Sequence, residues 1–103
     1  MKSITNRSVV LVTKEDGTED KATIGDLIKA VCRQTPEGGF TIEDVRARMR
    51  VVDAVDLAIK SDKAINLEDA DHATLLACVQ QMRWGILSKG IIEFNELIEK
   101  AGS

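Results

Sequence analysis

The chain has few aromatic residues and few of the side chains that enzymes use for acid-base chemistry. Its 103 residues include two phenylalanines, one tryptophan, one histidine and no tyrosine. A core must therefore be built from aliphatic side chains, and the aromatic platforms that stack on single-stranded nucleic acids are nearly excluded. With one histidine, arrangements of a nucleophile and a base have few candidate members. The sequence predicts a protein that is not an enzyme and needs no cofactor.

The lone histidine does not indicate a metal centre. His72 lies close to Asp69 and Asp71 at the expected start of a helix, but a zinc site needs further nitrogen or sulfur ligands. We expect His72 to be solvated or hydrogen-bonded to a neighbouring carboxylate. The sequence predicts no metal site.

Long apolar runs and cysteines are scarce as well. The longest apolar run covers residues 75–79, far short of the ~20 residues that span a bilayer, and residues 9–12 are too short for a signal peptide. Cys32 and Cys78 are far apart in sequence and lie among apolar residues, where free cysteine behaves as a small hydrophobe. These features predict a cytoplasmic protein with reduced thiols and no membrane association.

Length and charge indicate one ordinary globular domain. The chain is 44% hydrophobic and 30% charged, and 14 basic against 17 acidic residues give a net charge of −3. Such a chain has room for one core. We expect a single domain over residues 1–103, with residues 1–7 and 102–103 frayed.

The first 25 residues predict a β-hairpin. Residues 8–13 are rich in β-branched side chains, residues 21–24 resume an extended pattern, and Asp16-Gly17 between them suits a two-residue turn. This turn would place Leu11 opposite Ala22, Val9 opposite Ile24 and Lys14 opposite Glu19. Val10 and Val12 then lie on the other face of the hairpin.

The rest of the chain predicts helices. Apolar positions repeat with helical spacing after residue 24, after an N-cap at Thr41, after the acidic residues 68–71 and after an N-cap at Ser88. Pro36, Gly38 and Gly39 mark a loop, and Gly85 marks the end of the third helix. The expected buried stripes are Ile24, Leu27, Ile28 and Val31; Val45, Met49, Val52, Val55 and Ile59; Leu75, Leu76, Val79 and Met82; and Ile91, Phe94, Leu97 and Ile98. The fold class is α+β, mostly α: an N-terminal β-hairpin followed by about four helices in one compact domain.

Basic residues concentrate at Arg46, Arg48 and Arg50. Each has an acid within helical reach, namely Glu43, Asp44 and Asp53, which favours a solvated face with ion pairs. The alternative is a helix-turn-helix DNA-binding regulator, since residues 36–45 resemble the entry to the second helix of such motifs in winged-helix regulators. No helix breaker follows in residues 49–53, where a turn into a recognition helix should lie, and a pI of 5.1 also disfavours nucleic acid.

Three apolar residues are candidates for protein interaction. Val10 and Val12 make the second face of the hairpin more apolar than a solvated face requires, and could pair with another chain. Trp84 stands at an expected helix end, and tryptophan is enriched at interface hot spots. Phe94 falls within a helical stripe and Phe40 is expected to anchor a loop, so Trp84 is the ring that the core does not obviously need.

Several segments resemble small, largely uncharacterised proteins encoded by tailed bacteriophages and prophages. The likeness rests on Asp16-Gly17, on residues 23–28, on an Arg-containing helix over residues 45–58, on residues 66–69 and on a short terminal helix. The resemblance implies a bacterial host cytoplasm and a role through binding rather than catalysis. The expected function is a non-catalytic interaction module of virion assembly or host takeover that binds a protein partner or another copy of itself.

Overall fold

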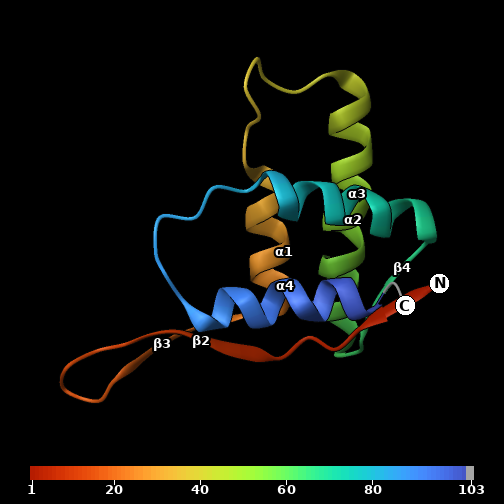
Figure 1. The fold of residues 1–103 in the computed structure, drawn as a ribbon. Helices are drawn as coiled ribbons and strands as arrows, with labels where there is room; N and C mark the ends of the chain where they lie inside the picture. Colours follow the sequence, from red (N-terminus) through yellow and green to blue (C-terminus); the bar gives the residue numbers. More distant parts are fainter. Residues whose placement is uncertain (102–103) are drawn as a thin grey trace.

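The computed structural model describes residues 1–101, and they form four helices and two separate two-stranded sheets. The predicted α+β fold, with an N-terminal hairpin and mainly helical structure after it, is confirmed. The helices α1 and α2 lie side by side, and α3 and α4 run across them (Figure 1). In chain order the elements are β1 (Lys2–Ile4), β2 (Ser8–Thr13), β3 (Glu19–Thr23), α1 (Ile24–Arg33), α2 (Ile42–Ser61), β4 (Ile65–Leu67), α3 (Asp69–Gln81) and α4 (Lys89–Ala101).

The N-terminal segment is ordered, which corrects the expectation that residues 1–7 are frayed. Strand β1 pairs antiparallel with β4, with Ile4 opposite Ile65. Ile4 and Ile65 are 1% and 0% exposed, so this strand pair contributes directly to the core. The other expected frayed segment, residues 102–103, lies outside the described residues.

The hairpin forms, but its turn differs from the predicted two-residue turn. The amide of Lys14 donates to the carbonyl of Thr18 at 2.7 Å, and the amide of Gly17 donates to the carbonyl of Lys14 at 3.0 Å. Gly17 has φ 87°, a left-handed conformation that favours glycine. Asp16 accepts hydrogen bonds from the amide and hydroxyl of Thr18, and these bonds lower the pKa of its carboxyl group. The loop therefore contains three residues, 15–17.

The longer turn and an irregularity between Val10 and Val12 change the strand register. Val9 lies opposite Ala22, so the predicted pairing of Leu11 with Ala22 is wrong. Lys14 pairs with Asp20 at 3.4 Å instead of with Glu19. Near the helices the shift is two residues, which keeps each side chain on its predicted face, and Val9 is buried as expected.

The first two helices begin at threonine caps, of which the one at Thr41 was predicted. Thr23 Oγ1 accepts a hydrogen bond from the amide of Asp26, and the predicted stripe of α1 is buried in full. Thr41 Oγ1 accepts from the amide of Asp44, while a carboxylate oxygen of Asp44 accepts from the amide of Thr41. These reciprocal bonds form a capping box, and they lower the pKa of Asp44.

The predicted stripe of α2 is only partly correct. Val52 and Val55 are buried, but Val45, Met49 and Ile59 are 43%, 47% and 46% exposed. The buried residues of α2 are Val51, Val52, Val55 and Ala58, from the middle of the helix onward. Val45 and Met49 are exposed because α2 has 20 residues and α1 has 10, so the first turns of α2 extend beyond the body of the protein (Figure 1).

The last two helices complete the core. Helix α3 ends at Gln81, earlier than the predicted end near Gly85, and it buries Leu75, Cys78 and Val79, whereas Leu76 and Met82 are half-buried. In α4 the predicted Ile91, Phe94 and Ile98 are buried and Leu97 is half-buried. Ser88 Oγ accepts a hydrogen bond from the amide of Gly90 at 3.1 Å, as a residue capping the start of α4 should.

His72 is a core residue, which corrects the expectation of a solvated side chain. It is 4% exposed, and its Nε2 lies 2.9 Å from the carbonyl oxygen of Ile98 in α4. The bond joins α3 to α4. The partner is a backbone carbonyl rather than a neighbouring carboxylate.

Candidate interaction surface

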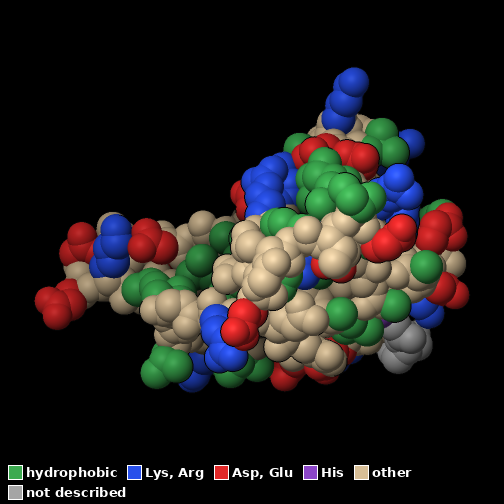
Figure 2. Space-filling view, turned by 90° about the horizontal axis from the view of Figure 1, so that it is seen from above, with side chains coloured by type: hydrophobic (Ala, Val, Ile, Leu, Met, Phe, Trp, Pro, Cys, Tyr) green, Lys and Arg blue, Asp and Glu red, His purple; other side chains and the backbone are tan. Residues whose placement is uncertain are grey.

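The exposed half of α2 borders an apolar groove. The groove has a volume of about 280 Å³, and its walls come from the end of α1, the loop between α1 and α2, and the first half of α2. Its lining residues are Cys32, Arg33, Phe40, Val45, Arg48, Met49 and Val52. Figure 2, which views the molecule from this end, shows hydrophobic side chains with basic and acidic ones around them. We call this site the α1–α2 groove.

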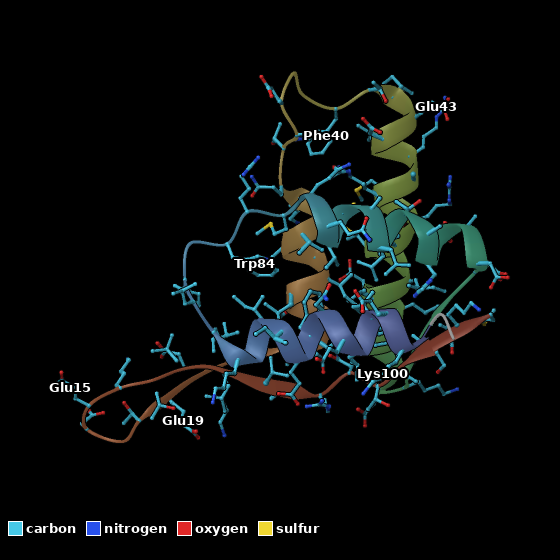
Figure 3. All side chains as sticks on the ribbon, viewed as in Figure 1. Glu15, Glu19, Phe40, Glu43, Trp84 and Lys100 are labelled. Atoms are coloured by element: carbon cyan, nitrogen blue, oxygen red, sulfur yellow. The ribbon has the colours of Figure 1, made fainter. Side chains whose placement is uncertain are left out.

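The loop before α2 places a ring at this groove. Gly38 and Gly39 have φ 84° and 86°, and the amide of Gly39 donates to the carbonyl of Pro36 at 2.9 Å. Two successive left-handed residues reverse the chain direction, which the glycines permit without strain. Phe40 consequently turns back toward α2 instead of continuing away from it (Figure 3).

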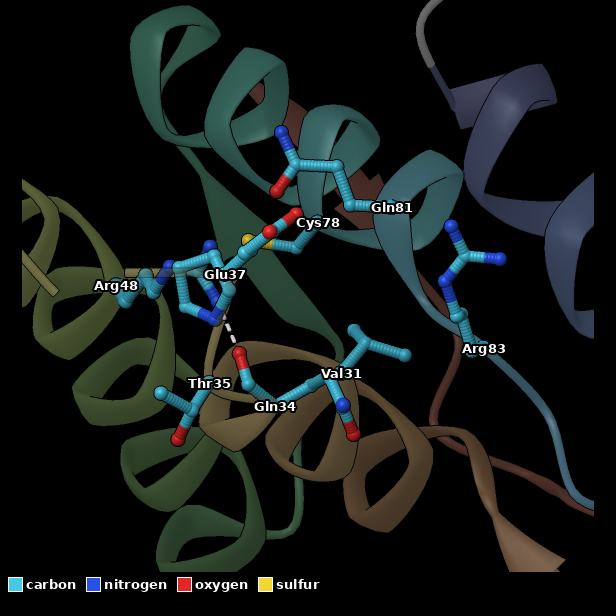
Figure 4. A pocket seen from close by; sticks show the side chains of 9 residues that line it. Val31, Gln34, Thr35, Glu37, Arg48, Cys78, Gln81 and Arg83 are labelled. Atoms are coloured by element: carbon cyan, nitrogen blue, oxygen red, sulfur yellow. Dashed lines mark hydrogen bonds between the residues drawn. The ribbon is translucent and has the colours of Figure 1, made fainter. Parts of the chain in front are cut away.

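Arg48 contacts each of the segments that form the groove. Its Nη1 donates to the carbonyl oxygens of Cys32 at 3.1 Å and Gln34 at 3.0 Å, and so binds the backbone at the end of α1 (Figure 4). Its guanidinium carbon lies 5.0 Å from the centroid of the Phe40 ring, within the range of a cation–π interaction. The side chain connects α2 to the end of α1 and to the loop in a fixed arrangement.

The three predicted basic candidates do not form one surface. Arg46 pairs with Glu43 at 3.9 Å, as expected. Arg50 pairs with Asp71 of α3 at 3.0 Å rather than with Asp53. With Arg48 turned to the end of α1, the three residues make contacts with different partners within the fold.

Three arginines near the groove form no ion pair with a carboxylate of the described residues. Within residues 1–101, no carboxylate lies within ion-pair distance of Arg33, Arg48 or Arg83. Arg33 lines the groove, whereas Arg83 lines a neighbouring pocket with Arg48 and Cys78 (Figure 4). Glu37 lines that neighbouring pocket as well, so the arginines there lie near a carboxylate without forming an ion pair with it.

The predicted interaction candidates occupy different surroundings. Val10 is half-buried beneath α4, whereas Val12 is 38% exposed on the projecting part of the hairpin (Figure 1). Trp84 is half-buried against the core, with its ring centroid 6.2 Å from that of Phe94 and the two planes at 75°. Trp84 and Val10 thus contribute mainly to packing, and Val12 remains accessible.

A second apolar surface follows Trp84, and the sequence analysis missed it. Ile86, Leu87 and Ile92 are 42%, 102% and 59% exposed. They lie in the loop before α4 and on its first turn, beside a shallow pocket that Trp84 also lines. The useful signal was adjacency: two large aliphatic residues directly follow Trp84-Gly85 in a segment too irregular to bury them.

The two cysteines interact across the α1–α3 contact. Cys32 and Cys78 are free thiols, each 3% exposed. A hydrogen bond from the Cys32 thiol lowers the pKa of Cys78 to about 7, with a further contribution from Arg48, while burial opposes the shift. The same hydrogen bond, together with burial, raises the pKa of Cys32. Cys78 is the acceptor of the pair.

Residues 1–101 contain no group of three or more His, Cys, Asp or Glu side chains placed to hold a metal ion. None of their helices combines the length and apolar character that crossing a membrane requires.

Comparison of the chain with protein-family models, with curated proteins and with solved structures finds no significant match in any of the three.

Proposed function

We propose that the protein is a small, non-catalytic protein-protein interaction module of the bacterial host cytoplasm, acting in a phage programme of virion assembly or host takeover. The phage setting follows from the sequence resemblance. The observation that carries the interaction role is the first half of α2, where Ile42, Val45 and Met49 are 66%, 43% and 47% exposed beside the α1–α2 groove. These residues are spaced i, i+3 and i+7, which places them along one face of the helix.

This apolar face does not serve the core. The buried residues of α2 begin at Val51, so the turns before it extend beyond the body of the protein while exposing large apolar side chains. Contiguous exposed apolar surface next to a formed groove is typical of a site that another macromolecule covers. Binding therefore accounts for a feature that folding alone does not require.

The DNA-binding alternative receives less support. Helix α2 continues without interruption through residues 49–53, where a helix-turn-helix motif would turn. Arg50 is paired with Asp71, and Arg48 is bound to carbonyl oxygens. A duplex-binding measurement at low salt tests this alternative, since phosphate contacts lose affinity steeply as salt is added.

The interaction role is tested by capture from a phage-infected bacterial lysate with tagged wild-type protein and two variants. Met49→Glu places a charge at the groove, whereas Leu57→Glu places the same charge at a 67% exposed position of α2 that does not line it. We expect wild type and Leu57→Glu to retain the same protein at a fixed stoichiometry and Met49→Glu to lose it. Equal retention by all three, or no retained protein with wild type, would contradict the proposal.

A further inference from the structure

The α1–α2 groove combines an apolar floor with positive charge at its edge. Phe40, Val45, Met49 and Val52 supply the floor, and Arg33 and Arg48 are the charged residues that line it. Among the described residues, no carboxylate lines this groove and none forms an ion pair with either arginine. Glu37 and Asp44 lie beside Arg48 in the neighbouring pockets, but neither lines the groove itself.

Both arginines can bind a carboxylate without rearranging the groove. Arg48 directs Nη1 at two backbone carbonyls, which fixes the guanidinium while its other nitrogens retain N–H groups. Arg33 is exposed at the end of α1. Two guanidinium groups beside an apolar floor suit a ligand that carries carboxylates next to apolar side chains, because charge-assisted hydrogen bonds then form beside buried apolar contacts.

The groove's size limits the ligand to a segment. A volume of about 280 Å³ holds a few apolar side chains rather than the surface of a folded domain. The exposed positions 42, 45 and 49 continue the apolar surface along α2, so a second element can lie beside this helix. An amphipathic segment would cover both the groove and the exposed face.

We propose that the α1–α2 groove binds an acidic, amphipathic peptide segment of another protein. This proposal rests on the interaction role above and specifies the chemistry of the partner. The attraction is local: the whole chain has a net charge of −3, so an acidic ligand gains no general electrostatic advantage and must use Arg33 and Arg48.

The test uses two synthetic amphipathic peptides of equal length, one built from leucine and glutamate and the other from leucine and lysine. Binding to the full chain is followed by two-dimensional NMR. We expect the leucine-glutamate peptide to bind saturably, with the largest shifts at Phe40, Val45 and Met49, and the leucine-lysine peptide to bind more weakly. Arg33→Glu should weaken binding about fivefold, since it replaces an attraction with a repulsion.

Lys60→Glu is the matched control, because it makes the same charge change at an exposed position near the other end of α2. It should leave binding within about twofold of wild type. Equal weakening by Arg33→Glu and Lys60→Glu would overturn the proposal, as would a preference for the leucine-lysine peptide or shifts located elsewhere.

Two outcomes separate this proposal from the broader one. If lysate capture depends on Met49 while the acidic peptide does not bind, the interaction role stands and the acidic chemistry is wrong. If sedimentation shows a dimer that Met49→Glu abolishes, the groove is occupied by a second copy, which also overturns the proposal of a different acidic partner.

Discussion

Replacing Gly90 with alanine should destabilise the protein more than any other glycine-to-alanine change at an unstrained backbone position. Gly90 lies at the start of α4, where the helix meets β2. A Cβ atom built there would lie 2.1 Å from the carbonyl oxygen of Val10 and 2.9 Å from its carbonyl carbon. Carbon atoms in ordinary contact are ~3.5–4.0 Å apart, so α4 or β2 must move by roughly 1 Å.

The obstructing atoms are backbone, and no side-chain rotation relieves the clash. Helix α4 carries Ile91, Phe94 and Ile98 into the core, so a shift of the helix disturbs all three. Overpacking costs about 1–3 kcal/mol, and a backbone clash belongs at the upper end of that range. The higher helix propensity of alanine offsets less than about 1 kcal/mol of this destabilisation. We expect a net loss of about 2–3 kcal/mol, and a melting temperature lower by about 10–20 °C.

The assay is urea unfolding followed by the fluorescence of Trp84, the one tryptophan of the chain, whose ring contacts Phe94 of α4. Two other glycines provide controls. A Cβ at Gly85 meets nothing within 4 Å, and one at Gly25 lies 3.1 Å from Val55 Cγ1 and 3.2 Å from Asn6 Oδ1.

The expected order of destabilisation is Gly90→Ala, then Gly25→Ala, then Gly85→Ala. Side chains obstruct the Cβ at Gly25 and can give by a few tenths of an ångström, whereas the carbonyl at Gly90 cannot. If Gly90→Ala were as stable as Gly85→Ala, the close approach of α4 to β2 would be refuted.

Three further predictions address the caps, the N-terminal strand and the thiols. Thr41→Ala removes one half of the capping box and should cost about 1 kcal/mol in thermal unfolding; an unchanged melting temperature would mean that the cap does not form. Ile4→Ala should cost about 2–4 kcal/mol in urea, because the side chain is 1% exposed; a loss below 1 kcal/mol would agree with a frayed terminus instead. The ultraviolet absorbance of the thiolate should titrate near the Cys78 pKa of about 7, and Cys32→Ala should move it toward the ordinary 9.0; no difference between the two proteins would remove the assigned hydrogen bond. Since folding lowers the pKa of Cys78, its thiolate stabilises the fold above pH 9.0, and this contribution is lost as the pH falls through 7. Folding raises the pKa of Cys32, so a pH above 9.0 favours the unfolded state through this thiol.

Features that depend on neighbours in sequence were predictable. The cap at Thr41 needs only a hydroxyl three residues before an amide, and the stripe of α1 needs only its 3.6-residue period. Both signals depend only on residues close in sequence, so the packing of the rest of the chain does not change them. The same is true of the loop containing Gly38 and Gly39, where two left-handed residues suit glycine.

Features that depend on distant pairing were not predictable. Strands β1 and β4 have three residues each and are separated by about sixty positions, so the local sequence does not indicate that they pair. The hairpin register failed for a different reason. A three-residue and a two-residue loop both accommodate Asp16-Gly17, and the choice between them moves every cross-strand pair.

The candidate site was missed because periodicity reports that a helix has an apolar face, not what covers it. Val45 and Met49 continue the same stripe as Val52 and Val55, and the sequence offers no reason to divide them. The division arises where α1 ends and its loop leaves the body, which is a property of the packing. A stripe that continues past its covering layer becomes exposed surface with the composition of a core.

Of the three aromatic residues, Phe40 rather than Trp84 is the candidate for contacting a partner. Phe94 is fully buried, and Trp84 packs on it at the edge of the core, so two of the three rings stabilise the fold. Phe40 is 39% exposed and lies outside the core cluster, where it contacts Arg48 at the groove. In a chain that builds its core from aliphatic residues, this ring leaves apolar surface that the core does not cover. Its large apolar face is instead available to a partner, which is why the groove, and not the rim of the core, is the site to test first.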